Sequence, residues 1–199
     1  MPKYSSINES LLKPGDKILF HTRGFSPMSM GIRFLTKSFW NHVGQYEEKD
    51  GIWAYVIEAL GKGVVKTSID KYVNNKKYIL KVVRLREEAF KDHKEYIKGL
   101  ATSRERMHDS IGSKYDYWAI VWIGLKYTIK GFFKKTSVNL FQSREKFYCS
   151  ELICENDYKI SSLNPFMYRG TTNQKCDTTT PKDIGKAKTA KFITGEDRI

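Results

Sequence analysis

The 199-residue chain has few cysteines, and their spacing fits no common framework. Cys149, Cys154 and Cys176 are an odd number, and no pair has the C-x-x-C spacing of many metal sites. We therefore predict neither a disulfide scaffold nor a zinc site, and we expect no metal and no organic cofactor. Three free thiols indicate a reducing, cytoplasm-like compartment.

The sequence also lacks a long apolar run. Residues 1–16 are polar where a signal peptide would carry its apolar stretch. The most apolar segment, residues 115–133, is interrupted by Lys126, whereas a spanning helix needs about 20 mostly apolar residues. We predict a cytoplasmic protein in which this segment is a buried helix. Its Trp118 and Trp122 leave open an interfacial helix and peripheral attachment to a membrane.

Charge is strongly unbalanced toward the basic side. The formal net charge of +13 favours an anionic partner such as a membrane or polymer surface, although a biased genome composition explains a lysine excess equally well. The chain has no recognised nucleic-acid motif and no regular interleaving of aromatic and basic residues, which argues against nucleic acid. The oligomeric state is not predicted.

The chain shows no repeat, linker or heptad pattern, and its length suits one domain covering residues 1–199. β-Prone runs fill the first half, and helical patterns follow, which is typical of an α+β domain with a mainly antiparallel sheet. Residues from Thr171 onward are predicted to be irregular, with a mobile tail after about residue 185. The predicted strands are residues 17–23, 41–48, 52–60, 63–69 and 78–86, and the predicted helices are residues 87–107, 115–133 and 149–158.

Cys149 lies where a loop meets a helix, because Leu152 and Ile153 begin an apolar face. The amides and partial positive charge of a helix N-terminus stabilise a thiolate, and they can bind an oxyanion. This position predicts a nucleophile at Cys149, whereas Cys154 and Cys176 are interpreted as buried residues or ordinary free thiols.

A cysteine nucleophile needs a base and a group that orients the base. His42 opens a strand in an apolar setting, and the run from Lys49 to Gly51 is typical of a three-residue hairpin loop. Glu48 then opposes Ile52, and His42 faces Glu58 at about 4.5–5.5 Å between Cβ atoms. We therefore predict that Glu58 orients His42. His21 remains a weaker candidate for the base, and His93 and His108 lie in a charged helix.

Several motifs in order resemble one family, the circularly permuted NlpC-type, papain-like cysteine hydrolases, which has bacterial and poxvirus members and is related to the lecithin:retinol acyltransferase group. The resemblance covers most of the chain, with Gln45 and the basic segment from Lys126 to Lys146 as departures. The motifs are Gly15-Asp16, Ser38-Phe39-Trp40-Asn41-His42-Val43-Gly44, Val56-Ile57-Glu58-Ala59, Gly63-Val64, Val83-Arg84-Leu85, Tyr115-Asp116-Tyr117, Tyr148-Cys149-Ser150-Glu151-Leu152 and Thr180-Pro181.

The resemblance implies a permuted papain-like fold with a catalytic triad of Cys149, His42 and Glu58. It also implies a thiol hydrolase that cleaves a peptide-like amide, as in cell-wall peptides, through a thioacyl-enzyme. A lipid ester or amide hydrolase or acyltransferase at a membrane is the alternative, and a non-catalytic module that binds an anionic polymer is a second. Trp40, Tyr117 and Tyr148 are predicted to line the substrate cleft, or else to be core aromatics.

Overall fold

The computed structural model describes residues 7–24, 30, 33–34, 38–49, 53–73, 75–116, 146–165, 167–168, 176 and 179–193. Within them, six strands form one sheet in the order β4-β3-β2-β1-β5-β8, and every neighbouring pair is antiparallel. The α+β class with a mainly antiparallel sheet is thereby confirmed. The strands are β1 (Lys17–Thr22), β2 (His42–Lys49), β3 (Trp53–Leu60), β4 (Gly63–Ser68), β5 (Tyr78–Leu85) and β8 (Ala190–Phe192).

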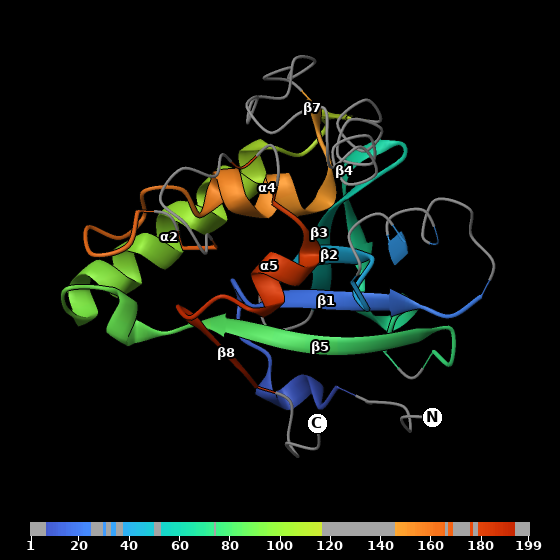
Figure 1. Cartoon of the computed structure of the whole chain (residues 1–199), viewed down its shortest axis with the longest axis horizontal. Coiled ribbons are helices and arrows are strands. Elements are labelled where there is room, and N and C mark those ends of the chain that lie inside the picture. Colours follow the sequence, from blue (N-terminus) through green and yellow to red (C-terminus); the bar gives the residue numbers. More distant parts are fainter. Residues whose placement is uncertain are drawn as a thin grey trace, which may run out of the picture.

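Each face of this sheet carries its own apolar cluster, because successive side chains along a strand point to opposite faces. The first cluster joins Leu19, Val43 and Ile57 to residues of α2 (His93–Asp109), α4 (Cys149–Asn156) and α5 (Pro181–Gly185). Figure 1 shows these three helices on the same side of β1, and α4 contacts β2 and β3. The second cluster includes Phe20 and Val56 and takes in residues next to the short 3₁₀ helices η1 (Glu9–Leu11) and η2 (Ile69–Lys71).

The long helix begins later than the sequence predicts. Residues 87–89 form a separate 3₁₀ turn, η3 (Glu87–Ala89), and α2 begins at His93. Asp92 stops the helix from extending further back, because its backbone is extended and its side chain accepts a hydrogen bond from the Glu95 amide at 2.7 Å.

A short parallel pair lies just before Cys149. Its strands are β6 (Lys114–Tyr115) and β7 (Lys146–Phe147). Residues on either side of the basic segment are therefore neighbours in space, although they are far apart in sequence. The helix predicted over residues 115–133 is not present at its first residue, which belongs to β6, and its remainder from residue 117 lies outside the described residues.

The irregular tail predicted from Thr171 is a second correction. Thr180 caps α5 by accepting a hydrogen bond from the Asp183 amide, and Ile184 is completely buried. β8 then pairs with β5 at the edge of the sheet, so residues 186–193 are not a loose tail. The weak β-signal of this segment is compensated by tertiary packing, which overrides local propensity. Residues 194–199 lie outside the described residues.

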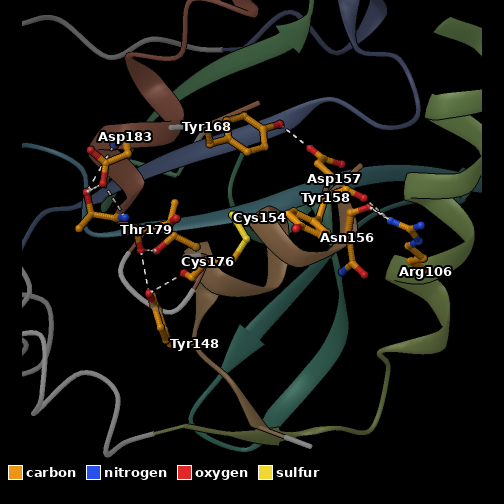
Figure 2. The surroundings of a disulfide bond; sticks show 12 residues. Arg106, Tyr148, Cys154, Asn156, Asp157, Tyr158, Tyr168, Cys176, Thr179 and Asp183 are labelled. Atoms are coloured by element: carbon orange, nitrogen blue, oxygen red, sulfur yellow. Dashed lines mark hydrogen bonds between the residues drawn. A yellow bond between two sulfur atoms is a disulfide. The ribbon is translucent and has the colours of Figure 1, made fainter. Parts of the chain in front are cut away.

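A third correction concerns the cysteines, because Cys154 and Cys176 form a disulfide bond that joins α4 to the segment before α5 (Figure 2). The prediction of three free thiols is wrong, and only Cys149 is unpaired. An odd number of cysteines is compatible with one bond and one free thiol, and spacing along the chain says nothing about pairs that meet only in the fold. In the part of the chain that the structure describes, no helix is long and apolar enough to cross a membrane.

A buried polar network secures the other end of α4. Asp157, which follows the helix, lies 3.2 Å from Lys17 Nζ, and Lys17 also donates a hydrogen bond to Gln45. Ser103 and Tyr168 donate hydrogen bonds to the same carboxylate. Gln45, which lies on a strand beside this network, accepts a hydrogen bond from a buried lysine.

Candidate active site

Cys149 is the first residue of α4. The preceding Tyr148 has an extended backbone, with φ −98° and ψ 166°, so the chain enters the helix directly at the cysteine. The thiol is 3% exposed and lies at the end of the helix where backbone amides have no partner within the helix. The predicted placement of a free thiol at a helix N-terminus is confirmed.

His42 begins β2, and its imidazole Nε2 lies 2.6 Å from Oε2 of Glu58 on β3. Glu58 is completely buried, whereas the His42 side chain is 17% exposed. The predicted hydrogen bond between these two side chains is confirmed. An imidazole held in this way through Nε2 has its Nδ1 available for another partner.

The strand register behind that prediction is wrong by two residues. Glu48 opposes Ala54 instead of Ile52, because β2 continues through Lys49, which pairs with Trp53. The same register carries Gly44, not His42, opposite Glu58. A Cβ atom on Gly44 would lie 3.1 Å from the Glu58 Cβ, so the glycine leaves the space across which Glu58 and His42 meet diagonally.

The third member of the group is Cys149, which lies close enough to His42 to shift the pKa of the imidazole. Burial lowers the pKa of His42, but hydrogen bonds to Cys149 and Glu58 and the negative charges of both raise it overall from 6.5 to about 10. The imidazolium form is therefore favoured at neutral pH. A charged imidazole beside a thiol stabilises the thiolate, which is the nucleophilic form of cysteine.

Glu58 has further hydrogen-bond partners. Tyr72 donates its hydroxyl hydrogen to Oε1 at 2.5 Å, and Thr67 on β4 also hydrogen-bonds to the carboxylate. Burial by itself raises the pKa of Glu58, but the hydrogen bond and charge of His42, followed by Thr67 and Tyr72, lower it below its ordinary value. Glu58 therefore remains a buried carboxylate.

The three residues predicted to line the cleft have different fates. Trp40 is half-buried, stacks edge-on with Phe39 at 5.0 Å, and lies two residues before His42, so its substrate role stays a prediction. Tyr117 lies outside the described residues. Tyr148 is 3% exposed and donates its hydroxyl hydrogen toward the carbonyls of Cys176 and Thr179 at 3.2 and 3.0 Å. Those contacts make it a core residue, which corrects the predicted substrate contact.

The segment around Thr179 packs against the start of α4. The hydroxyls of Tyr148 and Ser150, the two residues that flank Cys149, both donate hydrogen bonds to the Thr179 carbonyl. Figure 2 shows Thr179 beside Tyr148, with the Cys154–Cys176 bond to their right. The disulfide thus fixes to α4 the same segment that supports the backbone around the thiol.

The other histidines have separate environments. His21 Nδ1 lies 2.7 Å from the Phe39 carbonyl oxygen, and its ring stacks on Phe39 at 4.0 Å. His93 is 72% exposed and pairs with Glu87, while His108 is 38% exposed on α2. His42 is thus the histidine that the fold joins to Cys149. Among the described side chains, no group of three or more His, Cys, Asp and Glu could hold a metal ion.

Sequence reasoning missed Tyr72 and Thr67. A tight turn between Leu60 and Gly63 pairs β3 with β4 and sets Val65 opposite Glu58, so a hairpin prediction at this turn would have carried Thr67 to the same face. Tyr72 gave no such signal, because it enters from the 3₁₀ turn after β4 and only the three-dimensional fold brings it to Glu58.

Comparison with known proteins shows a likeness of fold. No family model matches the chain, and no curated protein matches its sequence. A solved structure, the metalloprotein yiiX from Escherichia coli O157:H7 (DUF1105), is similar over 92% of this chain and 97% of that chain, with a TM-score of 0.57 and 18% sequence identity. At this identity the similarity concerns the fold alone.

Proposed function

We propose that the protein is a cysteine hydrolase or acyltransferase with a permuted papain-like fold, in which Cys149 is the nucleophile, His42 the general base and Glu58 the residue that orients the base. The observation that carries the proposal is one connected group: a thiol at a helix N-terminus that shifts the pKa of an imidazole, which a fully buried carboxylate holds at 2.6 Å.

The reaction begins when the Cys149 thiol gives its proton to His42 and the sulfur attacks a carbonyl carbon. The carbonyl π electrons move to oxygen, and amides at the start of α4 stabilise that oxyanion. Collapse of the intermediate expels the amine or alcohol, which takes the proton from His42, and leaves a thioester on Cys149. Water then attacks with help from His42 and releases the acid, whereas another nucleophile yields an acyl-transfer product.

The leading substrate class is a peptide-like amide, on the strength of the sequence resemblance to NlpC-type hydrolases. A lipid ester or amide is the second candidate. Phe34 and Phe39 favour it, because they are 77% and 48% exposed and lie shortly before His42 in a chain of net charge +13. Peptide amides and short-chain lipid esters in anionic vesicles, tested side by side, separate the two classes.

The catalytic proposal is tested without a substrate by alkylating Cys149 with iodoacetamide between pH 4 and 9 and measuring the modified peptide by mass spectrometry. The wild-type thiol should react well below pH 8.5, the pKa of an ordinary cysteine. His42→Ala should slow the reaction at pH 6 by about a hundredfold or more, and Glu58→Gln should slow it less.

His93→Ala is the matched control, since it removes an exposed histidine on α2 and should leave the profile unchanged. Cys149→Ser should abolish labelling at this position. A wild-type profile with an ordinary thiol pKa, unaltered by His42→Ala, would overturn the proposal. So would the absence of turnover on every amide and ester if it accompanied that ordinary profile.

A further inference from the structure

Glu58 has one carboxylate oxygen for His42 and another for Tyr72. Oε2 lies 2.6 Å from His42 Nε2, and Oε1 accepts the Tyr72 hydroxyl hydrogen at 2.5 Å. We propose that Tyr72 is a positioning residue of the active site, which fixes the Glu58 carboxylate in the orientation that binds His42. This inference rests on the proposed function and adds a fourth residue to it.

The Tyr72 side chain is itself held rigidly. Its backbone amide donates to the Ile69 carbonyl at 2.8 Å at the end of η2, and the residue is 4% exposed. Its ring packs edge-on against Phe20 at 4.7 Å and against Tyr78 at 5.0 Å. The enclosed ring keeps the hydroxyl beside Glu58 Oε1, to which it donates its hydrogen.

Phe20 also joins the two ends of this arrangement. Its ring lies 5.2 Å from the His42 ring and 4.7 Å from the Tyr72 ring. The apolar surface around Phe20 excludes water from the hydrogen bonds between His42, Glu58 and Tyr72. Hydrogen bonds to a charged group strengthen when water is excluded, so the contribution of each donor increases.

The electrostatics give Tyr72 a specific task. The titratable groups around the Glu58 carboxylate are His42 from β2, Tyr72 after η2 and Tyr78 from β5, while Cys149 acts through His42. Burial and the Glu58 charge raise the pKa of Tyr72 well above its usual value, so the phenol remains a proton donor. Without this donor, the fully buried carboxylate would lose one of its hydrogen bonds and would protonate at a higher pH.

Protonation of Glu58 removes the negative charge that stabilises the His42 imidazolium. The imidazolium and the Cys149 thiolate form together, so the loss of one destabilises the other. The rate of Cys149 alkylation should fall at low pH, where the thiolate is protonated, and we call this part of the pH profile the acid limb. Removal of the Tyr72 hydroxyl should therefore move the acid limb to higher pH, while the rate at pH values above the limb changes little.

The experiment compares iodoacetamide alkylation of Cys149 in wild type and Tyr72→Phe between pH 4 and 9. Tyr72→Phe retains the ring and removes only the hydroxyl. Its acid limb should lie about one pH unit higher, which corresponds to an up to tenfold slower reaction on the limb. Tyr78→Phe, which removes a neighbouring hydroxyl and leaves the Tyr72–Glu58 bond in place, is the control and should match wild type.

A double-mutant cycle tests whether Tyr72 acts through Glu58. In the Glu58→Gln background, Tyr72→Phe should not move the limb further. A limb in Tyr72→Phe that coincides with wild type, or a rate lowered equally at every pH, would overturn the positioning role. Those outcomes leave the proposed function intact if His42→Ala still abolishes the low-pH reactivity, so the two failures are distinguishable.

Discussion

Two buried carboxylates of this protein, those of Glu58 and Asp157, have the same kinds of partner: a cation, a tyrosine hydroxyl and a second hydroxyl. Their surroundings differ. Glu58 binds a cationic His42, and its Oε1 accepts the hydroxyl hydrogen of Tyr72 at 2.5 Å. Asp157 binds the cationic Lys17, and its Oδ2 accepts the hydroxyl hydrogen of Tyr168 at 2.5 Å. Each carboxylate also has a hydroxyl partner from an adjoining element, Thr67 for Glu58 and Ser103 for Asp157.

The cation distinguishes the two sites. The Lys17 side chain is 1% exposed and ends on Asp157, Ser103 and Gln45. The His42 side chain is 17% exposed and has a second ring nitrogen, and the Cys149 thiol contributes to its raised pKa. A buried ion pair thus contributes only to the structure when its cation is enclosed. It can take part in a reaction when the cation can exchange a proton with a nucleophile.

Lys17→Met should produce the largest effect on stability, because it leaves Asp157 as an unpaired buried charge. Loss of one partner of a buried pair typically costs about 3–5 kcal/mol of the free energy of unfolding. Urea denaturation at pH 7 measures this loss. Cys149 alkylation in the folded variant should remain within about threefold of wild type. If Lys17→Met has wild-type stability, or if its acid limb moves as in Tyr72→Phe, the two carboxylates do not differ in role as we infer.

The sequence predicted which residues meet in the candidate site, but it predicted their geometry less well. Cys149 before an apolar helical face, and a glutamate in an apolar strand that requires a partner, are local signals, and both predicted placements are confirmed. The register was not predictable, because a turn can shift by a residue without altering any local pattern. His42 and Glu58 still meet although the register differs from the predicted one, because Gly44 has no side chain and leaves room for their diagonal contact.

The remainder depended on contacts between distant segments. Lys17 and Asp157 lie 140 residues apart in sequence, and Cys154 and Cys176, which are separated by 22 residues, meet only in the folded chain. Lysine side chains are mostly exposed in proteins, yet Lys17 is 1% exposed. Buried polar partners of this kind leave no periodic pattern in either segment, so composition and spacing cannot pair them.

The His42–Glu58 pair should also make stability depend on pH. A folded-state pKa of about 10 for His42, against 6.5 when unfolded, gives stabilisation that is complete below pH 6.5 and lost as pH rises through 10. The depressed pKa of Glu58 gives stabilisation present above its ordinary pKa of 4.5 and lost as pH falls through the folded-state pKa.

Denaturation of wild type and His42→Gln at pH 6.5 and pH 10 measures the alkaline part. The stability difference between the two proteins should be on the order of 3 kcal/mol smaller at pH 10. Cys149→Ser, which removes the thiolate that shares the His42 proton, should show an intermediate dependence. If His42→Gln and wild type lose the same stability between the two pH values, the imidazolium is not stabilised by the fold.

The Cys154–Cys176 disulfide bond should stabilise the helix that joins the two sites, because Cys154 lies on α4 between Cys149 and Asp157. Replacement of Cys154 and Cys176 by alanine opens a closed loop of 22 residues and should cost about 3 kcal/mol. A dithiol reductant should lower the stability of wild type to that of the double variant and leave the double variant unchanged. An equal response of both proteins to the reductant would contradict the bond.

Gly44→Ala should have the smallest effect on stability and still alter the site. The added Cβ would lie 2.4 Å from Val56 Cγ1 and 3.1 Å from both the Glu58 Cβ and the Ile57 carbonyl oxygen. Overpacking of this kind costs about 1–3 kcal/mol. Because Glu58 must move away from the new methyl group, the acid limb of Cys149 alkylation should rise together with the loss of stability. Val56→Ala in the same chain should recover part of the stability, since it removes the nearest contact, but it should not restore the limb. Full recovery of both would show that Val56 alone absorbs the strain and that Gly44 has no part in placing Glu58 against His42.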